Sequence, residues 1–348
     1  MRHAVLFSAA ALVAATVSVA DPTPAAAQGT AQPAPDQRVE MREWVVPWKN
    51  TRPRDPMRDP ASGRVWFVGQ EGNYVATLDP GTGAFKRYAI DDGTFPHDVI
   101  VDAHGDAWYA GNRNAMIGRL DGATGAITRY PMPDPAARDP HTLAFDGRGG
   151  IWFTVQGGNR VGRLDTRTGR IRLVAMPTPN ARPYGIVVDT AGRPWFAQFG
   201  TNRIGTIDPR TMALREFPLP NERSRPRRIA LTSDGTVWYV DYTRGMLGRL
   251  DPRTGKVREW ANPGGAGSLP YAMTVDDRDR LWFVETGPQP NRLVGFDPKV
   301  ERFVGVTPIG SGGGTVRHMT YDRATGTIWF GTDAGTIGRA VVRTGPIG

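Results

Sequence analysis

Seven tryptophans recur along this 348-residue chain, and successive ones lie 42 to 47 residues apart. Each is followed directly by Phe or Tyr, so the same aromatic pair returns at every interval. The seven are Trp66, Trp108, Trp152, Trp195, Trp238, Trp282 and Trp329. A fixed period of this length is the signature of a repeat architecture, in which stacked units of one kind bury a common core.

Shorter patterns divide each repeat into strands. In most repeats a second phrase begins about eight residues after the tryptophan, as in MIGRLD at 116–121 and RVGRLD at 160–165. A glycine-containing turn and an alternating segment such as ITRYPM at 127–132 follow it. Alternation with period 2 between glycine-marked turns predicts short antiparallel strands and no helix. Four strands in about 43 residues is the size of a propeller blade, so we predict an all-β, seven-bladed β-propeller.

The last repeat lacks a distinct fourth strand, since the chain ends soon after TIGRAVVRTG at 336–345. Near the other end of the chain, MREWVVP at 41–47 copies the fourth-strand phrase VREWANP at 257–263. We expect this N-terminal strand to complete the last blade, because the pairing would close the ring and leave no open sheet edge.

The first 38 residues resemble an export leader and not a folded domain. Arg2 and His3 precede the apolar run AVLFSAAALVAATVSVA, and AAAQG offers a cleavage point after Ala27. We predict a signal peptide at 1–27, a disordered lead-in at 28–38 and the propeller at 39–348. The apolar run is short for a bilayer span, so we expect a periplasmic or secreted protein without stable membrane insertion after cleavage. An uncleaved anchor is the alternative.

Composition restricts the chemistry further. The chain has no cysteine, which excludes disulfides, thiolate metal sites and cysteine nucleophiles. It has 43 Lys and Arg against 34 Asp and Glu, a formal net charge of +9, but the arginines are scattered and form no basic helix. This pattern argues against a nucleic-acid partner and favours an anionic small ligand or a cell-surface polymer. We expect a monomer.

One position, eleven or twelve residues before each tryptophan, is polar or aromatic in all seven repeats. It follows a proline in six repeats and a valine in the last, and its occupants are Arg54, His97, His141, Tyr184, Arg227, Tyr271 and Arg317. In a propeller this position enters the innermost strand beside the central channel, where a purely structural residue would repeat one apolar type. Seven such side chains predict a polar pocket for a small-molecule or peptide-like ligand at the channel mouth. We assign substrate binding to Tyr184, Arg227, Tyr271 and Arg317, with channel packing as the alternative for the two tyrosines.

The second strand of each blade ends at the channel mouth, where the innermost strand begins. Three residues after the tryptophan, the fifth repeat carries Asp241 and the sixth carries Glu285. Carboxylates at this level are candidates for binding a metal ion or a ligand, and we assign these two as metal ligands. The alternative is that each pairs with a neighbouring arginine.

The repeated phrases P-H-x-[LIV], D-G-x-[IVL]-W-F-T and N-R-[IV]-G-R-[LI]-D resemble the virginiamycin B lyase, or streptogramin lyase, family of seven-bladed propellers across residues 40 to 340. The resemblance implies a role in antibiotic resistance, by elimination at an ester of a cyclic depsipeptide without attack by water. It also implies a divalent metal, usually Mg²⁺. The family's catalytic group is a His after Pro in one blade and an acid-Pro-His phrase in the next.

This chain contains such a group, namely His97 in TFPHDV and Asp139 and His141 in RDPHTL. The resemblance implies that His141 is the base, that Asp139 orients it, and that a metal or Arg227 polarises the carbonyl. In the family, however, the acid is Glu and the group lies in late blades, whereas here it lies in the second and third.

Simpler roles remain open for all three residues. The two histidines would then cap strand ends and hydrogen-bond across the channel, and Asp139 would cap the turn before Pro140. The corresponding alternative for the whole protein is a non-catalytic propeller that binds a peptide, glycan or protein partner at the channel mouth.

Overall fold

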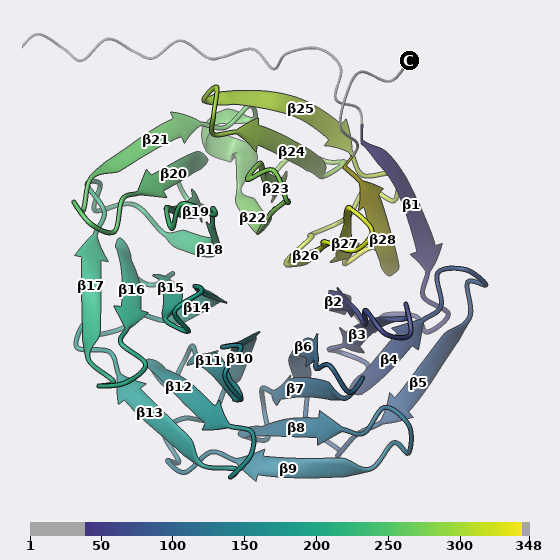
Figure 1. Ribbon diagram of the computed structural model, residues 1–348. Coiled ribbons are helices and arrows are strands. Elements are labelled where there is room, and N and C mark those ends of the chain that lie inside the picture. The colour runs from purple at the N-terminus through teal and green to yellow at the C-terminus, as the bar shows by residue number, and fades with distance from the viewer. Residues whose placement is uncertain (1–38, 343–348) are drawn as a thin grey trace, which may run out of the picture. The chain divides into compact units, whose positions relative to one another are not determined.

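The structure is a computed structural model that describes residues 39–342. Its 28 strands form seven four-stranded antiparallel sheets, and these blades stand in a ring around a central channel (Figure 1). The predicted seven-bladed, all-β fold is therefore confirmed. The proposed signal peptide and lead-in, 1–38, lie outside the described residues, and within these no helix is long and apolar enough to cross a membrane.

Six blades consist of four consecutive strands, each set running from the channel outward. Blade one contains β2 (Pro53–Arg58), β3 (Val65–Gly69), β4 (Tyr74–Leu78) and β5 (Phe85–Ala89). Blade two contains β6 (Pro96–Val101), β7 (Ala107–Gly111), β8 (Met116–Leu120) and β9 (Ile127–Pro131). Blade three contains β10 (Pro140–Phe145), β11 (Gly150–Val155), β12 (Arg160–Asp165) and β13 (Ile171–Ala175). Blade four contains β14 (Pro183–Val188), β15 (Pro194–Gln198), β16 (Arg203–Ile207) and β17 (Leu214–Pro218).

The later blades repeat this order. Blade five contains β18 (Pro226–Leu231), β19 (Val237–Asp241), β20 (Met246–Leu250) and β21 (Val257–Ala261), and a 3₁₀ turn, η1 (Gly265–Ser268), follows it. Blade six contains β22 (Pro270–Val275), β23 (Leu281–Glu285), β24 (Arg292–Asp297) and β25 (Arg302–Pro308). Blade seven contains β26 (Met319–Asp322), β27 (Thr327–Gly331) and β28 (Thr336–Val341), with β1 (Glu40–Val45) as its outermost strand.

The N-terminal strand closes the ring as predicted. β1 pairs antiparallel with β28, with Glu40 opposite Val341 and Val45 opposite Thr336. Trp44 from this strand stacks on the blade-seven tryptophan, Trp329, with ring centroids 5.7 Å apart and planes at 26°. Backbone pairing and ring stacking together join the first described strand of the chain to the last.

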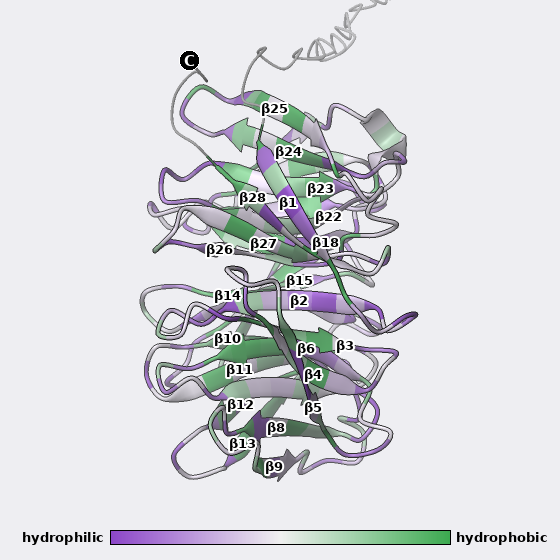
Figure 2. Cartoon of the chain, turned by 90° about the vertical axis from the view of Figure 1, so that its right-hand side faces the viewer, coloured by the Kyte–Doolittle hydropathy of each residue, from purple (hydrophilic) through white to green (hydrophobic). Residues whose placement is uncertain are grey.

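The seven repeated tryptophans lie between the blades, and each is at most 5% exposed. Several stack on an aromatic ring from the fourth strand of their own blade, as Trp66 does on Tyr88 at 5.1 Å and Trp238 on Trp260 at 5.5 Å. In Figure 2 the hydrophobic residues lie mainly on the strands, although β1 and β2 also carry hydrophilic ones. The sheets therefore carry the apolar core, which leaves the channel free for polar side chains.

Candidate functional site in the central channel

A backbone irregularity determines which side chains enter the channel. In six of the seven innermost strands, the register against the second strand shifts close to the initial proline. A bulge of this kind breaks strict alternation and re-aims side chains. In these six blades, two consecutive residues therefore lie beside the channel, and in blade seven Arg317 and His318, which directly precede β26, take the corresponding positions.

These residues form two rings, named here for use below. The first ring is the set that the sequence predicted: Arg54, His97, His141, Tyr184, Arg227, Tyr271 and Arg317. The second ring is formed by the next residue in each blade: Asp55, Asp98, Thr142, Gly185, Arg228, Ala272 and His318. The first ring lies toward the end of the channel where the innermost strands begin, which we call the proline end.

Blades two and three place their histidines in direct contact. The rings of His97 and His141 are 3.4 Å apart between centroids, and His97 Nδ1 lies 3.2 Å from the carbonyl oxygen of His141. Both residues are at least 95% buried. Burial first, and nearby arginine charge second, hold the pKa of each imidazole well below its usual value, so both are neutral at pH 7.

The tautomer of His141 follows from its neighbours. Its Nδ1 lies 2.8 Å from the Thr142 hydroxyl, and that hydroxyl accepts a hydrogen bond from Arg228 at 3.2 Å. The buried hydroxyl has no other acceptor among the described residues, so it donates to Nδ1. The imidazole proton of His141 therefore resides on Nε2, which makes this nitrogen a hydrogen-bond donor.

On the opposite side of the first ring, Arg227 lies among aromatic rings. Its guanidinium is 3.6 Å from the ring centroid of Tyr271 and 4.3 Å from that of Tyr242. Phe199 and Tyr184 complete this cage at 4.5 Å and 5.1 Å. Cation–π contacts with these four rings fix the position of the guanidinium beside the channel.

Tyr184 is the member of the cage that contacts the histidines. Its ring is 4.2 Å from that of His141, and its hydroxyl is hydrogen-bonded to the hydroxyl of Tyr271. Burial is the largest single influence on this phenol and would by itself raise its pKa. The surrounding guanidinium charges, led by those of Arg227 and Arg228, outweigh burial and lower the pKa of Tyr184 to about 8 from its usual value near 10.

The pKa of Tyr271 shifts in the opposite direction, because burial and the neighbouring Tyr184 both raise it. Tyr271 thus keeps its proton and donates to Tyr184 as the latter ionises. A phenol with a lowered pKa, beside a donor and a cation, is a candidate for proton transfer near neutral pH.

The second ring carries a charged network. Arg54 donates from Nε to Asp55 at 3.0 Å, and Arg228 Nη2 lies 3.7 Å from the other carboxylate oxygen of Asp55. Burial opposes ionisation of Asp55, but the charges of Arg54 and Arg228 lower its pKa. Two guanidiniums thus share one ionised carboxylate at the centre of the molecule.

Asp98 lies in the same network and behaves differently. It accepts the backbone N–H groups of Val99 at 2.8 Å and Leu143 at 2.7 Å. Burial and the neighbouring Asp55 raise the pKa of Asp98 to about 7. At neutral pH its carboxyl group is therefore protonated part of the time, which leaves the network with an excess of positive charge.

One group of possible metal donors occurs among residues 39–342: atoms of Asp55, Asp98 and His318 lie within 4.8 Å of one another. Its surroundings do not fit a divalent cation. Asp55 is already bonded to Arg54 and faces Arg228, and a divalent ion there would be repelled by both guanidiniums. The arginines already supply the positive charge that a metal would bring.

The assigned metal ligands lie elsewhere. Asp241 is fully buried, accepts the backbone N–H of Arg225 at 3.0 Å and lies 3.2 Å from Arg244. Glu285 is fully buried as well, accepts the N–H of Gly264 at 2.7 Å and pairs with Arg292. Neither belongs to the donor group described above. In the part of the chain that the structure describes, each carboxylate is paired with an arginine, as the alternative reading anticipated.

Asp139 is not brought to His141. Its carboxylate accepts the backbone N–H groups of Gly157 and Gly158 in the loop between β11 and β12, the second at 3.0 Å. It therefore caps the β11–β12 loop, and not the turn before Pro140 as the simpler role from sequence would have it, while Thr142 contacts His141 instead. The structure thus places the two histidines in contact and Asp139 in a different set of hydrogen bonds.

Arg317, the last of the predicted binding residues, forms an ion pair with Asp333 at 2.6 Å. Its guanidinium also lies 5.9 Å from the ring of Tyr271, so it borders the aromatic cage. The four assigned substrate-binding residues thus gather on one side of the first ring, with Arg227 at their centre.

The second ring was missed by reasoning from sequence. Each of its residues is the next letter after a first-ring residue, but alternation along a regular strand places neighbours on opposite faces. Polar residues at two consecutive positions, as in Arg54-Asp55 and Arg227-Arg228, were the available signal.

Fold and channel define a seven-bladed propeller with a polar, arginine-rich centre. Residues 36–232 match the Virginiamycin B lyase family. The chain belongs to this family. No curated protein matches it in a sequence search.

Solved structures agree with this assignment. A streptogramin B lyase is 25% identical, with a TM-score of 0.78 over 88% of this chain and 98% of the other. A catalytically inactive virginiamycin B lyase from Staphylococcus aureus with quinupristin is also 25% identical, with a TM-score of 0.79 over 88% and 100%. The extracellular domain of a hybrid two-component system from B. thetaiotaomicron, 17% identical with a TM-score of 0.66 over 90% and 44%, shares the fold alone.

Proposed function

We propose that the proline end of the channel is an acid–base site of the lyase type, which opens an ester or lactone of a cyclic depsipeptide or similar substrate by elimination. The observation that carries this proposal is Tyr184, a buried phenol with a pKa lowered to about 8 in contact with a caged guanidinium. Perturbed titratable groups of this kind concentrate at functional sites.

The chemistry assigned to Tyr184 is removal of a proton. Its phenolate takes the hydrogen from the carbon α to a carbonyl, and the electron pair left behind forms a carbon–carbon double bond to the β carbon. The C–O bond at that carbon breaks, and the bonding electrons leave with the carboxylate. No water is consumed, so ring opening leaves the mass of the substrate unchanged.

Arg227 and His141 are suited to stabilising the charge that develops. The Arg227 guanidinium lies beside Tyr184 and is fixed by the aromatic cage, so it is preorganised for a carbonyl oxygen or a departing carboxylate. His141, neutral and protonated on Nε2, is suited to donate a hydrogen bond to an enolate. This arrangement moves the base from His141, as expected from sequence, to Tyr184.

The charges in the channel also bear on whether the reaction uses a divalent metal. Since the donor group around Asp55 does not fit a divalent cation, the proposal assigns no step to Mg²⁺ and gives the electrophilic role to Arg227.

A periplasmic or secreted enzyme would meet an antibiotic of this class before it reaches its target. The structure of a relative with quinupristin supports a depsipeptide as the first substrate to test.

The test is to incubate the purified protein with quinupristin and to analyse the product by liquid chromatography and mass spectrometry. We expect a linear product of unchanged mass and at least an approximately 100-fold slower reaction in Tyr184→Phe. Tyr242→Phe is the matched control, because it removes a hydroxyl from the same cage without removing the base. A product heavier by one water would show hydrolysis, and binding without conversion would favour the non-catalytic propeller; either result contradicts the proposal.

A further inference from the structure

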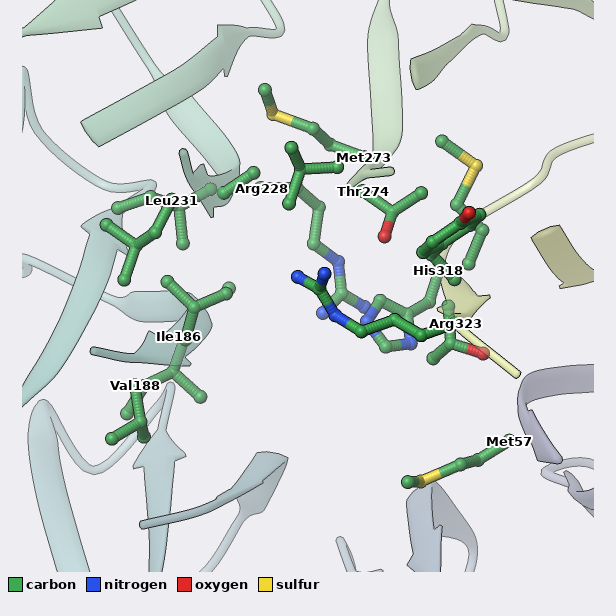
Figure 3. Close-up of a pocket in the computed structure, with 17 residues that line it drawn as sticks. Met57, Ile186, Val188, Arg228, Leu231, Met273, Thr274, His318 and Arg323 are labelled. Atoms are coloured by element: carbon green, nitrogen blue, oxygen red, sulfur yellow. The ribbon is translucent and has the colours of Figure 1, made fainter. Parts of the chain in front are cut away.

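The opposite end of the channel holds a cavity that the proposed reaction does not use. It has a volume of about 400 Å³ and is enclosed by the innermost strands of blades four to seven, β14, β18, β22 and β26, with Met57 from β2. Its lining runs from the second ring to the ends of these strands and includes Arg323 in the turn after β26. Figure 3 shows the side chains that line it.

One side of this cavity is apolar. The side chains that form it, called here the apolar wall, are Ile186, Val188, Leu231, Met273 and Val275. They occupy the ends of three consecutive innermost strands, and Figure 3 shows Ile186, Val188 and Leu231 grouped together. A concave apolar surface of this kind is typical of a binding site for the hydrophobic part of a small molecule.

The other side presents two cationic groups. Arg228 is 2% exposed and forms the inner end of the cavity, and its Nη2 makes no hydrogen bond, its nearest anionic group being Asp55 Oδ2 at 3.7 Å. Arg323, in the turn after β26, has no ion pair or side-chain hydrogen bond among the described residues, and Figure 3 shows its side chain extending across the cavity, where it overlaps that of Arg228 in this view. A buried N–H without a partner costs free energy that an acceptor would recover.

The local charges favour an anion as that acceptor. Around Arg228, Asp55 is ionised but is shared with Arg54, and no carboxylate lines the cavity itself. His318, also at the inner end, has an Nδ1 that makes no hydrogen bond and lies 3.9 Å from Asp55 Oδ2. A carboxylate could therefore accept from Arg228 at the inner end and from Arg323 at the mouth, with charge-assisted hydrogen bonds.

We propose that this cavity binds a small amphiphilic monoanion, with its carboxylate between Arg228 and Arg323 and its hydrocarbon body against the apolar wall. The site is separate from the acid–base site at the proline end, because the second-ring network lies between the two. Binding here does not depend on whether the protein is a lyase.

The test uses calorimetry on the purified protein with four probes: octanoate, octanol, octylammonium and acetate. We expect octanoate to bind at least about tenfold more tightly than the other three, because it alone satisfies both the guanidiniums and the apolar wall. Octanol or octylammonium binding as tightly as octanoate would overturn the role of the arginines. Acetate binding as tightly would overturn the role of the apolar wall.

Substitution of an exposed arginine at the mouth of the cavity tests the role of charge in a second way. Arg323 is exposed, and we expect Arg323→Ala to weaken octanoate binding about three- to tenfold and Arg323→Glu to weaken it further. Arg210→Ala removes the same charge from an exposed turn that does not line the cavity and should leave affinity unchanged. Equal affinities in the wild type and Arg323→Glu would refute the proposal.

Discussion

Arg228 Nη1 donates a hydrogen bond to the hydroxyl of Thr142 at 3.2 Å, so that one side chain crosses the channel from blade five to blade three. The same guanidinium donates to the carbonyl oxygen of Arg317 in blade seven at 3.2 Å and lies 3.7 Å from Asp55 in blade one. Gly185 lies against it, and an added Cβ there would be 3.1 Å from Arg228 Cδ. The centre of this propeller is thus held by a buried ionic network.

Removing Arg228 should destabilise the protein strongly. In Arg228→Met, the buried Asp55 loses part of its compensating charge, and we expect the free energy of unfolding to fall by about 3 to 5 kcal/mol. Adding Asp55→Asn should recover at least about 1 kcal/mol, since the uncompensated charge is then gone. Urea denaturation of the two single variants and the double variant measures this coupling. Additive losses would show that the two residues do not interact.

Ring closure should depend on the stacking of Trp44 on Trp329. We expect Trp44→Ala to lower the free energy of unfolding by about 3 to 5 kcal/mol, because a large buried ring is lost at the seam. Val45 follows it on the same strand and is 76% exposed, so Val45→Ala should change stability by no more than about 0.5 kcal/mol. Similar effects of the two changes in urea denaturation would contradict this account of closure.

The channel histidines should make the protein acid-sensitive. The folded-state pKa values of His97, His141 and His318 are all below the unfolded value near 6.5, so the stability that they contribute is present above that pH and is lost as pH falls. Asp98 has the opposite sign, because its pKa is raised to about 7 and its proton is held only in the folded state.

Between pH 5 and 6, roughly, the unfolded chain should therefore bind about two more protons than the folded one, which gives a slope of about 3 kcal/mol per pH unit. Asp98→Asn removes the opposing proton and should steepen the slope to about 4 kcal/mol per pH unit. Urea denaturation at several pH values measures both slopes. A stability that is constant over this range would show that the histidines are not held neutral.

Divalent metal should have little effect on stability. Because Arg54 and Arg228 occupy the surroundings of Asp55, we expect millimolar Mg²⁺ to shift Tm by less than about 1 °C. Differential scanning calorimetry with Mg²⁺ and with EDTA compares the two conditions. A rise of several degrees that disappears in Asp55→Asn would place an ion at this group and contradict the charge argument.

The architecture was predictable because its determinants are periodic. The seven tryptophans alone give the number of blades, and the likeness of MREWVVP to VREWANP predicts that the N-terminal strand closes the ring. These features depend on local strand patterns and on a core position repeated in every blade, which a single sequence displays directly.

The candidate site was predictable only in part. The first ring follows from the repeat, but the second ring depends on a bulge that alternation does not reveal. The sequence also did not reveal which residues the polar side chains of the site hydrogen-bond to. Asp139 is close to His141 in sequence yet binds a loop, whereas Arg228 reaches Thr142 from 86 residues away. Contacts between blades depend on side-chain length and direction in three dimensions, and no local pattern encodes them.

The central claim, that the channel cations activate Tyr184, is tested most directly by titrating tyrosine absorbance between about pH 7 and 9 in the wild type and in Tyr184→Phe. Burial raises the pKa of Tyr74 to about 12 and also raises that of Tyr271, so neither contributes in this range. We predict one phenolate forming near pH 8 in the wild type, absent from Tyr184→Phe and displaced to higher pH in Arg227→Met. Identical titrations of the wild type and Tyr184→Phe over this range would contradict the account.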